Sequence, residues 1–364
     1  MFVPRPPAIM PIHRLVYRPR LVWKSPKEAA PMNALALCRC AIALAIAWTL
    51  AACGGSSSGV GAVAPSSLDL KTKTYPELVV GFAQIGAESE WRTANTRSIQ
   101  DTANQLGVEL ALSDAQQQQE NQIKAIRSFI AQGVDVIGVS PVVETGWDEV
   151  FAEVKQAGIP LILLDRNANV PDDLYSVRIG SDFVEEGRRA CGEMARLLDG
   201  QGAIVVLEGT QGSAPMIGRG TGFQECLQSY PALHIIDSQS GDFIRARGKE
   251  EMAALLQKHG NSIDGVFAQN DDMALGAIEA IEEYGLRPGV DIKIVSIDAV
   301  RAAFEAMIDG KLNATIECNP LLGPLFFATA LNLANGIPVE KWIKPDEGIY
   351  RQDTAAQELS KREY

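Results

Sequence analysis

From residue 77 onward, the 364-residue sequence lacks the motifs of the commonest catalytic sites. It has no Gly-x-Ser-x-Gly nucleophile elbow, no phosphate-binding P-loop and no His-Glu-x-x-His metal site. The whole chain has three histidines, and no Cys-x-x-Cys or Cys/His cluster has the spacing of metal ligands. These absences argue against an enzyme, and no sequence feature indicates a metal or a cofactor.

Positive charge is scarce beyond the first 52 residues. That segment holds seven of the 33 lysines and arginines but only one of the 45 acidic residues. The rest of the chain is therefore more acidic than the net charge of −12 indicates. An acidic surface repels nucleic acid and anionic membranes, so we expect neither as a partner.

The apolar run Ala41–Leu50 is ten residues long, too short to cross a bilayer but suited to the core of a signal peptide. It is followed by Leu-Ala-Ala-Cys, which resembles the lipobox of bacterial lipoproteins, and then by a Gly/Ser tract. We therefore predict a signal peptide over residues 1–52, with Met32 a candidate for the true start. We also predict that Cys53 is lipidated and that this lipid is the protein's only link to a membrane. A flexible tether is predicted over residues 53–76. The alternative is a plain secretory cleavage site beside an incidental cysteine.

Three cysteines follow the predicted anchor: Cys191, Cys226 and Cys318. An odd number cannot form a complete disulfide framework, although an oxidising compartment allows one bridge. We expect instead that all three are small buried side chains.

Short apolar runs alternate with segments of helical periodicity from residue 77 onward. The apolar runs recur about every 25–30 residues, the length of a strand–helix–strand unit of a parallel sheet. Two such sets of similar size follow one another without a Pro/Gly-rich linker, which predicts two doubly wound α/β lobes joined by a hinge of crossing strands. The predicted strands cover Leu78–Ala83, Val108–Leu112, Val134–Val139, Pro160–Asp165, Ala203–Leu207, Leu233–Ile236, Gly265–Ala268 and Ile292–Ile297. The predicted helices cover Thr93–Leu106, Glu120–Ala131, Gly146–Gln156, Phe183–Leu198, Gly220–Ser229, Ala246–His259, Asp272–Tyr284 and Leu321–Ala334.

Each lobe is predicted to use two separate stretches of the chain. The N-terminal lobe would comprise residues 77–177 and 319–345, and the C-terminal lobe residues 178–318 and 346–364. The hinge would lie near residues 177–180, and the segments after Thr315 would cross back to complete both lobes.

The carboxyl ends of the predicted strands are unusually polar. Parallel sheets place their ligand sites at these ends. Carboxylates accept hydrogen bonds from sugar hydroxyls, guanidinium groups donate to them, and aromatic rings cover the apolar face of a sugar. The polar strand ends are residues 84–92, 114–120, 140–141, 165–166, 269–272 and 298, and both lobes contribute to them.

Several short motifs stand at these strand ends or beside them. Residues 86–92 read Gly-x-Glu-Ser-x-Trp-Arg, residues 119–125 Gln-Glu-Asn-Gln-Ile-Lys-Ala, and residues 163–166 Leu-Leu-Asp-Arg. Residues 239–243 read Gln-Ser-Gly-Asp-Phe, and residues 270–273 read Asn-Asp-Asp-Met. In this order and spacing, the motifs resemble the type I sugar-binding proteins of ABC importers, above all the members that bind galactofuranose.

The resemblance implies an exported monomer, periplasmic or at the cell surface, that delivers a monosaccharide to an ABC-transporter permease. Galactofuranose is the expected sugar. Cys318 stands roughly where the family has a glutamine in its second hinge, so the sequence departs from the family pattern at this contact. The implied ligand-binding residues are Glu88, Ser89, Trp91, Arg92, Asp165, Arg166, Arg219, Phe243, Asn270 and Asp298.

These residues also have structural alternatives. Trp91 can serve as a core residue, Asp165 and Arg166 as a surface ion pair, and Arg219 as a solvated side chain at a helix start. In the run after residue 269, we expect Asp271 or Asp272 to cap the following helix and Asn270 to bind ligand.

Other functions are less consistent with the sequence. A sugar sensor that presents its ligand to a chemoreceptor or kinase would share the binding site. A glycosidase would need a carboxylate pair such as Asp165 and Asp298, and we expect neighbouring arginines to keep both ionised. A transcription regulator would need a DNA-binding segment where the predicted signal peptide stands.

Overall fold

The computed structural model describes residues 72–364. The predicted signal peptide, the lipidation site Cys53 and most of the predicted tether lie outside the described residues. Among residues 72–364, no helix combines the length and the apolar character needed to cross a membrane.

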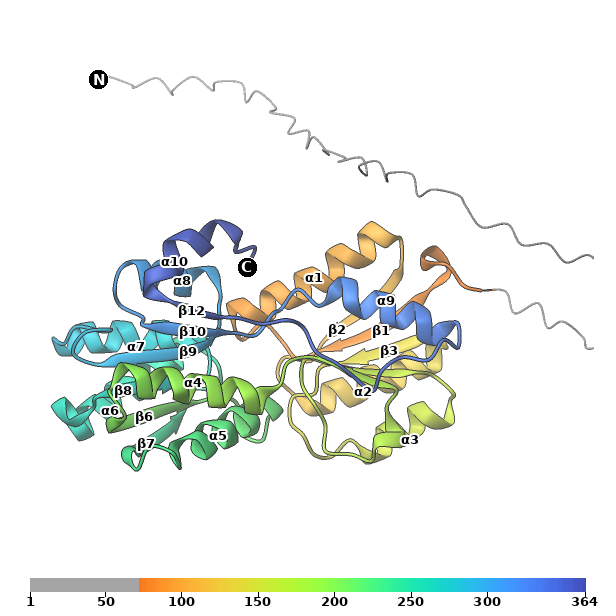
Figure 1. Ribbon diagram of the computed structural model, residues 1–364. Helices are drawn as coiled ribbons and strands as arrows, with labels where there is room; N and C mark the ends of the chain where they lie inside the picture. The colour runs from red at the N-terminus through yellow and green to blue at the C-terminus, as the bar shows by residue number, and fades with distance from the viewer. Residues whose placement is uncertain (1–71) are drawn as a thin grey trace, which may run out of the picture. The chain divides into compact units, whose positions relative to one another are not determined.

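Two six-stranded sheets form the framework of the described chain (Figure 1). The strands of the first sheet are all parallel. Their order is β11 (Trp342–Ile343), β5 (Val177–Ile179), β4 (Leu161–Leu164), β3 (Val136–Val139), β1 (Val79–Gln84) and β2 (Glu109–Asp114). The second sheet has the order β12 (Ile349–Arg351), β10 (Ala314–Glu317), β9 (Lys293–Asp298), β8 (Gly265–Ala268), β6 (Gln201–Glu208) and β7 (Ala232–Ser240). Only β12 runs antiparallel to its neighbour among these described strands.

Helices cover both faces of the first sheet because its central strands are apolar on both sides. Alternate residues of β4 enter different core clusters: Ile162 and Leu164 pack into one, and Leu161 and Leu163 into the other. The first cluster is completed by α1 (Glu90–Leu106) and α9 (Gly323–Ala334), and the second by α2 (Gln119–Gln132) and α3 (Asp148–Gln156). This is the continuous apolar pattern expected of buried parallel strands.

The second sheet carries the remaining helices of the described chain. In the second lobe α4 packs beside α5 and α6 beside α7. These helices are α4 (Phe183–Leu197), α5 (Ala214–Leu227), α6 (Arg245–His259), α7 (Asp271–Tyr284), α8 (Arg301–Ile308) and α10 (Gln352–Glu358). The predicted fold class, two doubly wound α/β lobes, is confirmed.

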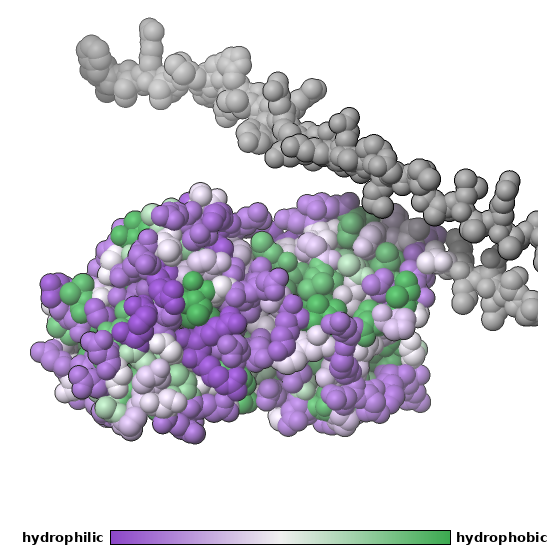
Figure 2. All heavy atoms as spheres, viewed as in Figure 1, coloured by the Kyte–Doolittle hydropathy of each residue, from purple (hydrophilic) through white to green (hydrophobic). Residues whose placement is uncertain are grey.

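The face drawn in Figure 2 is mostly hydrophilic, and its apolar side chains are scattered over both lobes. This distribution agrees with core clusters that lie against the sheets rather than at the surface.

A disulfide joins Cys191 of α4 to Cys226 of α5, with an S–S distance of 2.11 Å. The expectation that all three cysteines stay unpaired is therefore wrong, although Cys318 is free and buried. The two helices can approach closely because Gly222 has no side chain. A Cβ at this position would lie 1.8 Å from the carbonyl oxygen of Val184. This close packing brings the two cysteine Cα atoms to 6.0 Å, within the range of a bridge.

The chain crosses between the sheets in three segments, which are residues 180–182, 318–322 and 344–348. Figure 1 shows them running side by side between the lobes. Because β5 pairs within the first sheet through Ile179, the first crossing begins two residues after the boundary drawn from the sequence. We propose that these three segments form the hinge.

Candidate sugar-binding site

A cavity lies between the two lobes, at the carboxyl ends of both sheets. All ten predicted ligand-binding residues line it, together with Pro215 and Cys318. The N-terminal lobe contributes Glu88, Ser89, Trp91, Arg92, Asp165 and Arg166. The C-terminal lobe contributes Arg219, Phe243, Asn270 and Asp298.

Three of these residues hold a left-handed backbone conformation that side chains disfavour. The φ angle is 64° at Asp165, 65° at Phe243 and 130° at Asp298. Asp165 directly follows β4, and Asp298 ends β9. Gly180 allows this turn at Asp165, because a Cβ at Gly180 would lie 2.5 Å from the Asp165 carbonyl oxygen. Strained residues of this kind cluster at functional sites.

On the N-terminal wall, Arg92 links the acidic residues. Its Nη2 lies 2.5 Å from Oδ2 of Asp165, and its Nε lies 3.1 Å from Oε1 of Glu88. Burial alone would lower the pKa of Arg92, but these two carboxylates raise it above its ordinary value. Asp165 and Arg166 are both buried, so they do not form a surface ion pair.

Arg166 lies beside this network and is less well paired. Its Nη2 lies 3.6 Å from Oε1 of Glu88, and its Nη1 donates to the Val142 carbonyl oxygen at 3.0 Å. Burial, with the nearby charge of Arg92, lowers its pKa to about 10. Nε of Arg166 and Oε2 of Glu88 are buried without a hydrogen-bond partner. Two residues of the cavity wall therefore keep a donor and an acceptor that the protein itself does not satisfy.

On the opposite wall, Arg219 is buried among acceptors. Its Nε donates to Glu186 Oε2 at 2.8 Å, its Nη1 to the Gln269 carbonyl oxygen at 2.5 Å, and its Nη2 lies 3.5 Å from Asp298 Oδ1. Burial raises the pKa of Asp298 well above its ordinary value, and Arg219 offsets only part of this effect. Burial therefore opposes the ionised form of Asp298 and Arg219 favours it, so the expectation that arginines keep Asp298 ionised stays a prediction.

The residues at the start of α7 have different partners from those expected. Asn270 caps the helix, since its side-chain oxygen accepts from Met273 N at 2.9 Å, and its Nδ2 donates to the Phe243 carbonyl oxygen at 3.1 Å. The expectation that Asp271 or Asp272 caps α7 is wrong. Asp271 accepts from Thr315 Oγ1 at 2.8 Å inside the lobe, and Asp272 accepts from the backbone N–H of Glu90 at 2.9 Å.

The aromatic residues connect the lobes. Trp91 is 4% exposed, and its indole N–H donates to the Cys318 carbonyl oxygen at 2.6 Å. It packs with the core of the opposite lobe as well as lining the cavity, so the core interpretation describes it and its role in binding stays a prediction. The Phe243 ring lies 5.3 Å from the Arg166 guanidinium carbon of the other lobe.

The comparisons with known proteins agree with this architecture. Residues 80–337 match a family model described as a periplasmic binding protein domain, and the chain belongs to that family. Over 290 residues, the chain is 44% identical to the galactofuranose-binding protein YtfQ of Escherichia coli (strain K12), covering 78% of this chain and 91% of that protein.

Two solved structures are similar over the same part of the chain. One is the periplasmic binding protein of the arabinose ABC transporter from Shewanella sp. ANA-3, bound to L-arabinofuranose. It is 46% identical with a TM-score of 0.76, and the match covers 78% of this chain and 95% of that chain. The other, from Mycobacterium smegmatis in complex with β-D-fucofuranose, is 52% identical with a TM-score of 0.76 and coverages of 78% and 94%.

Proposed function

We propose that the protein is an exported, lipid-anchored solute-binding protein that captures a monosaccharide and delivers it to an ABC importer. The cavity between the lobes carries this proposal. It joins carboxylates, guanidinium groups, an amide and aromatic rings, the groups that pair sugar hydroxyls and cover the apolar face of a sugar.

The cavity favours binding over catalysis. Arg92 pairs with Asp165 at 2.5 Å, which occupies one member of the only carboxylate pair that the sequence suggested for glycoside hydrolysis. The unpaired Oε2 of Glu88 and Nε of Arg166 are suited instead to hold a hydroxyl, which donates and accepts at once. We therefore propose that the protein is not an enzyme. A sensor that presents its sugar to a chemoreceptor or kinase would use the same cavity and differ in its partner.

Galactofuranose is the proposed ligand. The three relatives described above are named for galactofuranose, arabinofuranose and fucofuranose, which share a five-membered ring. Galactofuranose also carries an exocyclic diol that a pyranose lacks. A site that pairs each hydroxyl rejects an isomer that leaves buried groups unpaired. Losing two charge-assisted hydrogen bonds weakens binding by about a hundredfold or more.

Calorimetry with galactose, arabinose, ribose and glucose, and with methyl galactofuranoside and methyl galactopyranoside, whose ring forms cannot interconvert, tests the proposal. We expect the galactofuranoside to bind with a Kd of about 1 μM, which corresponds to about −8 kcal/mol. Tighter binding of any pyranose hexose would overturn the furanose assignment. Absence of binding by every sugar would overturn the sugar-binding proposal itself.

A further inference from the structure

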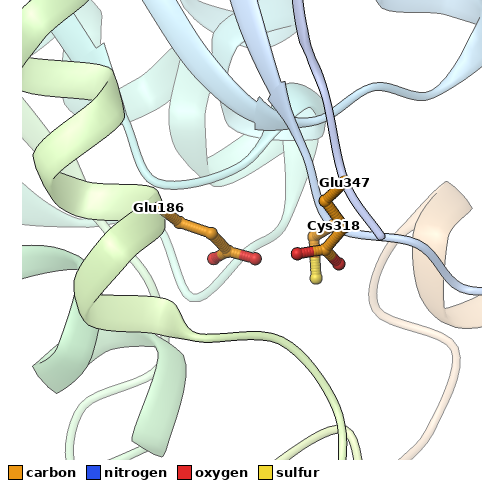
Figure 3. Close-up of side chains that lie close together, drawn as sticks. All are labelled: Glu186, Cys318 and Glu347. Atoms are coloured by element: carbon orange, nitrogen blue, oxygen red, sulfur yellow. The ribbon is translucent and has the colours of Figure 1, made fainter. Parts of the chain in front are cut away.

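Three side chains of the kinds that bind metals converge behind the sugar cavity (Figure 3). Glu186 belongs to α4, while Cys318 and Glu347 belong to two of the segments that cross between the lobes. One carboxylate oxygen of each glutamate and the Cys318 sulfur all lie within 4.8 Å of one another. Glu186 and Cys318 are each 2% exposed, so the cluster is shielded from bulk water.

Glu186 supplies the observation that points to a ligand. Its Oε2 accepts from Arg219, but its Oε1 is buried and has no hydrogen-bond partner. Figure 3 shows this carboxylate directed toward Cys318 and Glu347. An unpaired buried acceptor costs roughly 1–3 kcal/mol, and more for a charged group, so a cation at this point would remove a substantial penalty.

The other two side chains are held in place by neighbours. Glu347 Oε1 accepts from Ser181 Oγ at 2.5 Å and from Asn319 N at 2.9 Å. Ser181 Oγ also lies 3.4 Å from the Cys318 sulfur. Hydrogen bonds of this kind orient metal ligands before the ion arrives.

The charges of the cluster fit a divalent ion. Metal binding requires deprotonated ligands, so the two carboxylates and the thiolate would carry three negative charges around the ion, and Arg219, paired to Glu186 at 2.8 Å, supplies one positive charge. A divalent cation would bring the group to neutrality.

An acidic surface pocket borders the cluster. Glu186 and Glu347 line a surface pocket together with Asp182, Glu185 and Asp346. The two cations in its wall are already paired, Arg189 with Glu185 at 3.0 Å and Lys344 with Asp182 at 2.8 Å. The pocket is therefore acidic overall and attracts positive ions.

The donor set selects the kind of metal. Mg²⁺ and Ca²⁺ prefer oxygen ligands alone, whereas a thiolate selects softer ions. We propose that Glu186, Cys318 and Glu347 bind a divalent cation of the zinc class, with a fourth position open to water. The ion would fasten α4 to two of the crossing segments, which are the segments that must move when the lobes separate.

Cobalt(II) is the probe, because it enters zinc sites and a cobalt–thiolate bond gives an intense near-ultraviolet band. We expect the purified protein to bind one Co²⁺ per chain with such a band, and excess Zn²⁺ to remove it. In Cys318→Ser the band should be absent, and this comparison isolates Cys318 because every other cysteine is unchanged. Glu347→Gln should weaken Co²⁺ binding at least about tenfold.

The matched control is Asp346→Asn, which changes a carboxylate of the pocket outside the proposed ligand set. It should bind Co²⁺ within about twofold of wild type. A wild-type protein without the band would overturn the proposal. It would indicate that a proton shared between the side chains of the cluster, and not a metal ion, offsets their charge. A band that persists in Cys318→Ser, or full affinity in Glu347→Gln, would also overturn it.

Discussion

Asp165 and Asp298 occupy equivalent places in the two lobes. Each stands at the carboxyl end of a buried strand, each has a positive φ angle, and each lies against an arginine. This conformation turns the chain where the strand ends, and both carboxylates line the cavity there. A backbone cost of about 1–3 kcal/mol is tolerated where the surroundings fix the residue.

Replacing Asp165 by Asn tests the role of this carboxylate in binding. Asn tolerates the left-handed conformation at φ 64° and keeps the shape of the side chain, so the change removes the charge and exchanges one acceptor oxygen for an amide donor. Hydrogen bonds to charged groups contribute about 1.5–3 kcal/mol, and we expect sugar affinity to fall about 10- to 100-fold by calorimetry.

Arg245→Ala is the control for this variant. Arg245 pairs with Glu279 on the surface, with its side chain 47% exposed, and its loss should change affinity by less than about 0.5 kcal/mol. Equal losses in the two variants would mean that the cavity is not the binding site.

The anchor prediction also concerns one residue. If Cys53 carries lipid, Cys53→Ser should abolish incorporation of labelled fatty acid and leave the precursor uncleaved or the protein unanchored. Metabolic labelling followed by membrane fractionation measures both effects. Normal acylation of the variant would exclude Cys53 as the lipidated residue.

Among the elements, those with strong periodicity could be predicted from the sequence. Strand β8 has the predicted bounds, and the C-terminal ends of α1 and α2 lie beside Gly107 and Gly133, whose positive φ angles end both helices. The predicted start of α5 at Gly220 is six residues late, because Pro215 in the first turn fixes φ and starts the helix there. The two-residue strand β11 and the eight-residue helix α8 are too short for a periodic signal.

The residues that line the cavity could be predicted from the sequence better than the contacts that hold the lobes and helices around it. All ten residues that the family resemblance implied line one cavity. Asp165 and Asp298 lie where the strand-end rule for parallel sheets expects ligand residues, whereas Arg219 lies within α5 and was indicated by the resemblance alone. The contact between Asp272 and Glu90 N, and the pairing of Cys191 with Cys226, join positions distant in sequence. Periodicity and local motifs carry no information on such contacts.

The disulfide between α4 and α5 should stabilise the C-terminal lobe. It closes a loop of sequence separation 35, which in the chain-entropy account corresponds to about 2–4 kcal/mol. We expect the double variant Cys191→Ala and Cys226→Ala to lose this free energy of unfolding, measured by urea titration. Dithiothreitol should lower the free energy of unfolding of wild type by the same amount and leave that of the variant unchanged. If the variant is less stable than reduced wild type by about 2–4 kcal/mol, the loss comes from the changed packing and not from the missing disulfide.

For the molecule as a whole, the described conformation has the lobes in direct contact. Glu144 N donates to the Gly212 carbonyl oxygen at 2.9 Å, and Trp91 and Asp272 make further hydrogen bonds between the lobes. A sugar can enter the buried cavity only if these contacts open. We therefore expect the radius of gyration in solution scattering to decrease when sugar is added, and an unchanged curve at saturating sugar would argue for a rigid cleft.

Closure should also depend on pH through Asp272. Burial, together with the charges of Glu90 and Asp271, raises the pKa of this carboxyl to about 7, although the Glu90 N–H and Arg245 oppose the rise. When the lobes separate, Asp272 returns to water and its pKa moves toward the ordinary value of 3.8. The closed form therefore holds a proton more tightly than the open form. The contribution of Asp272 to closure is fully present below about pH 4 and is lost as the pH rises to about 7.

Sugar affinity should consequently fall as the pH rises from about 5 to about 7, with one proton setting an upper limit of about tenfold per pH unit. Calorimetry in two buffers of different ionisation enthalpy measures this effect directly, because binding in this range should take up a proton.

Asp272→Asn is the matched variant: its side-chain oxygen can still accept from Glu90 N–H, but it cannot titrate. We expect the variant to bind with little pH dependence and to be tighter than wild type at pH 8, where wild type must bury a charge. Proton uptake of equal size in both proteins would place the pH-sensitive group elsewhere, and no uptake in wild type would mean that Asp272 titrates alike in the open and closed forms.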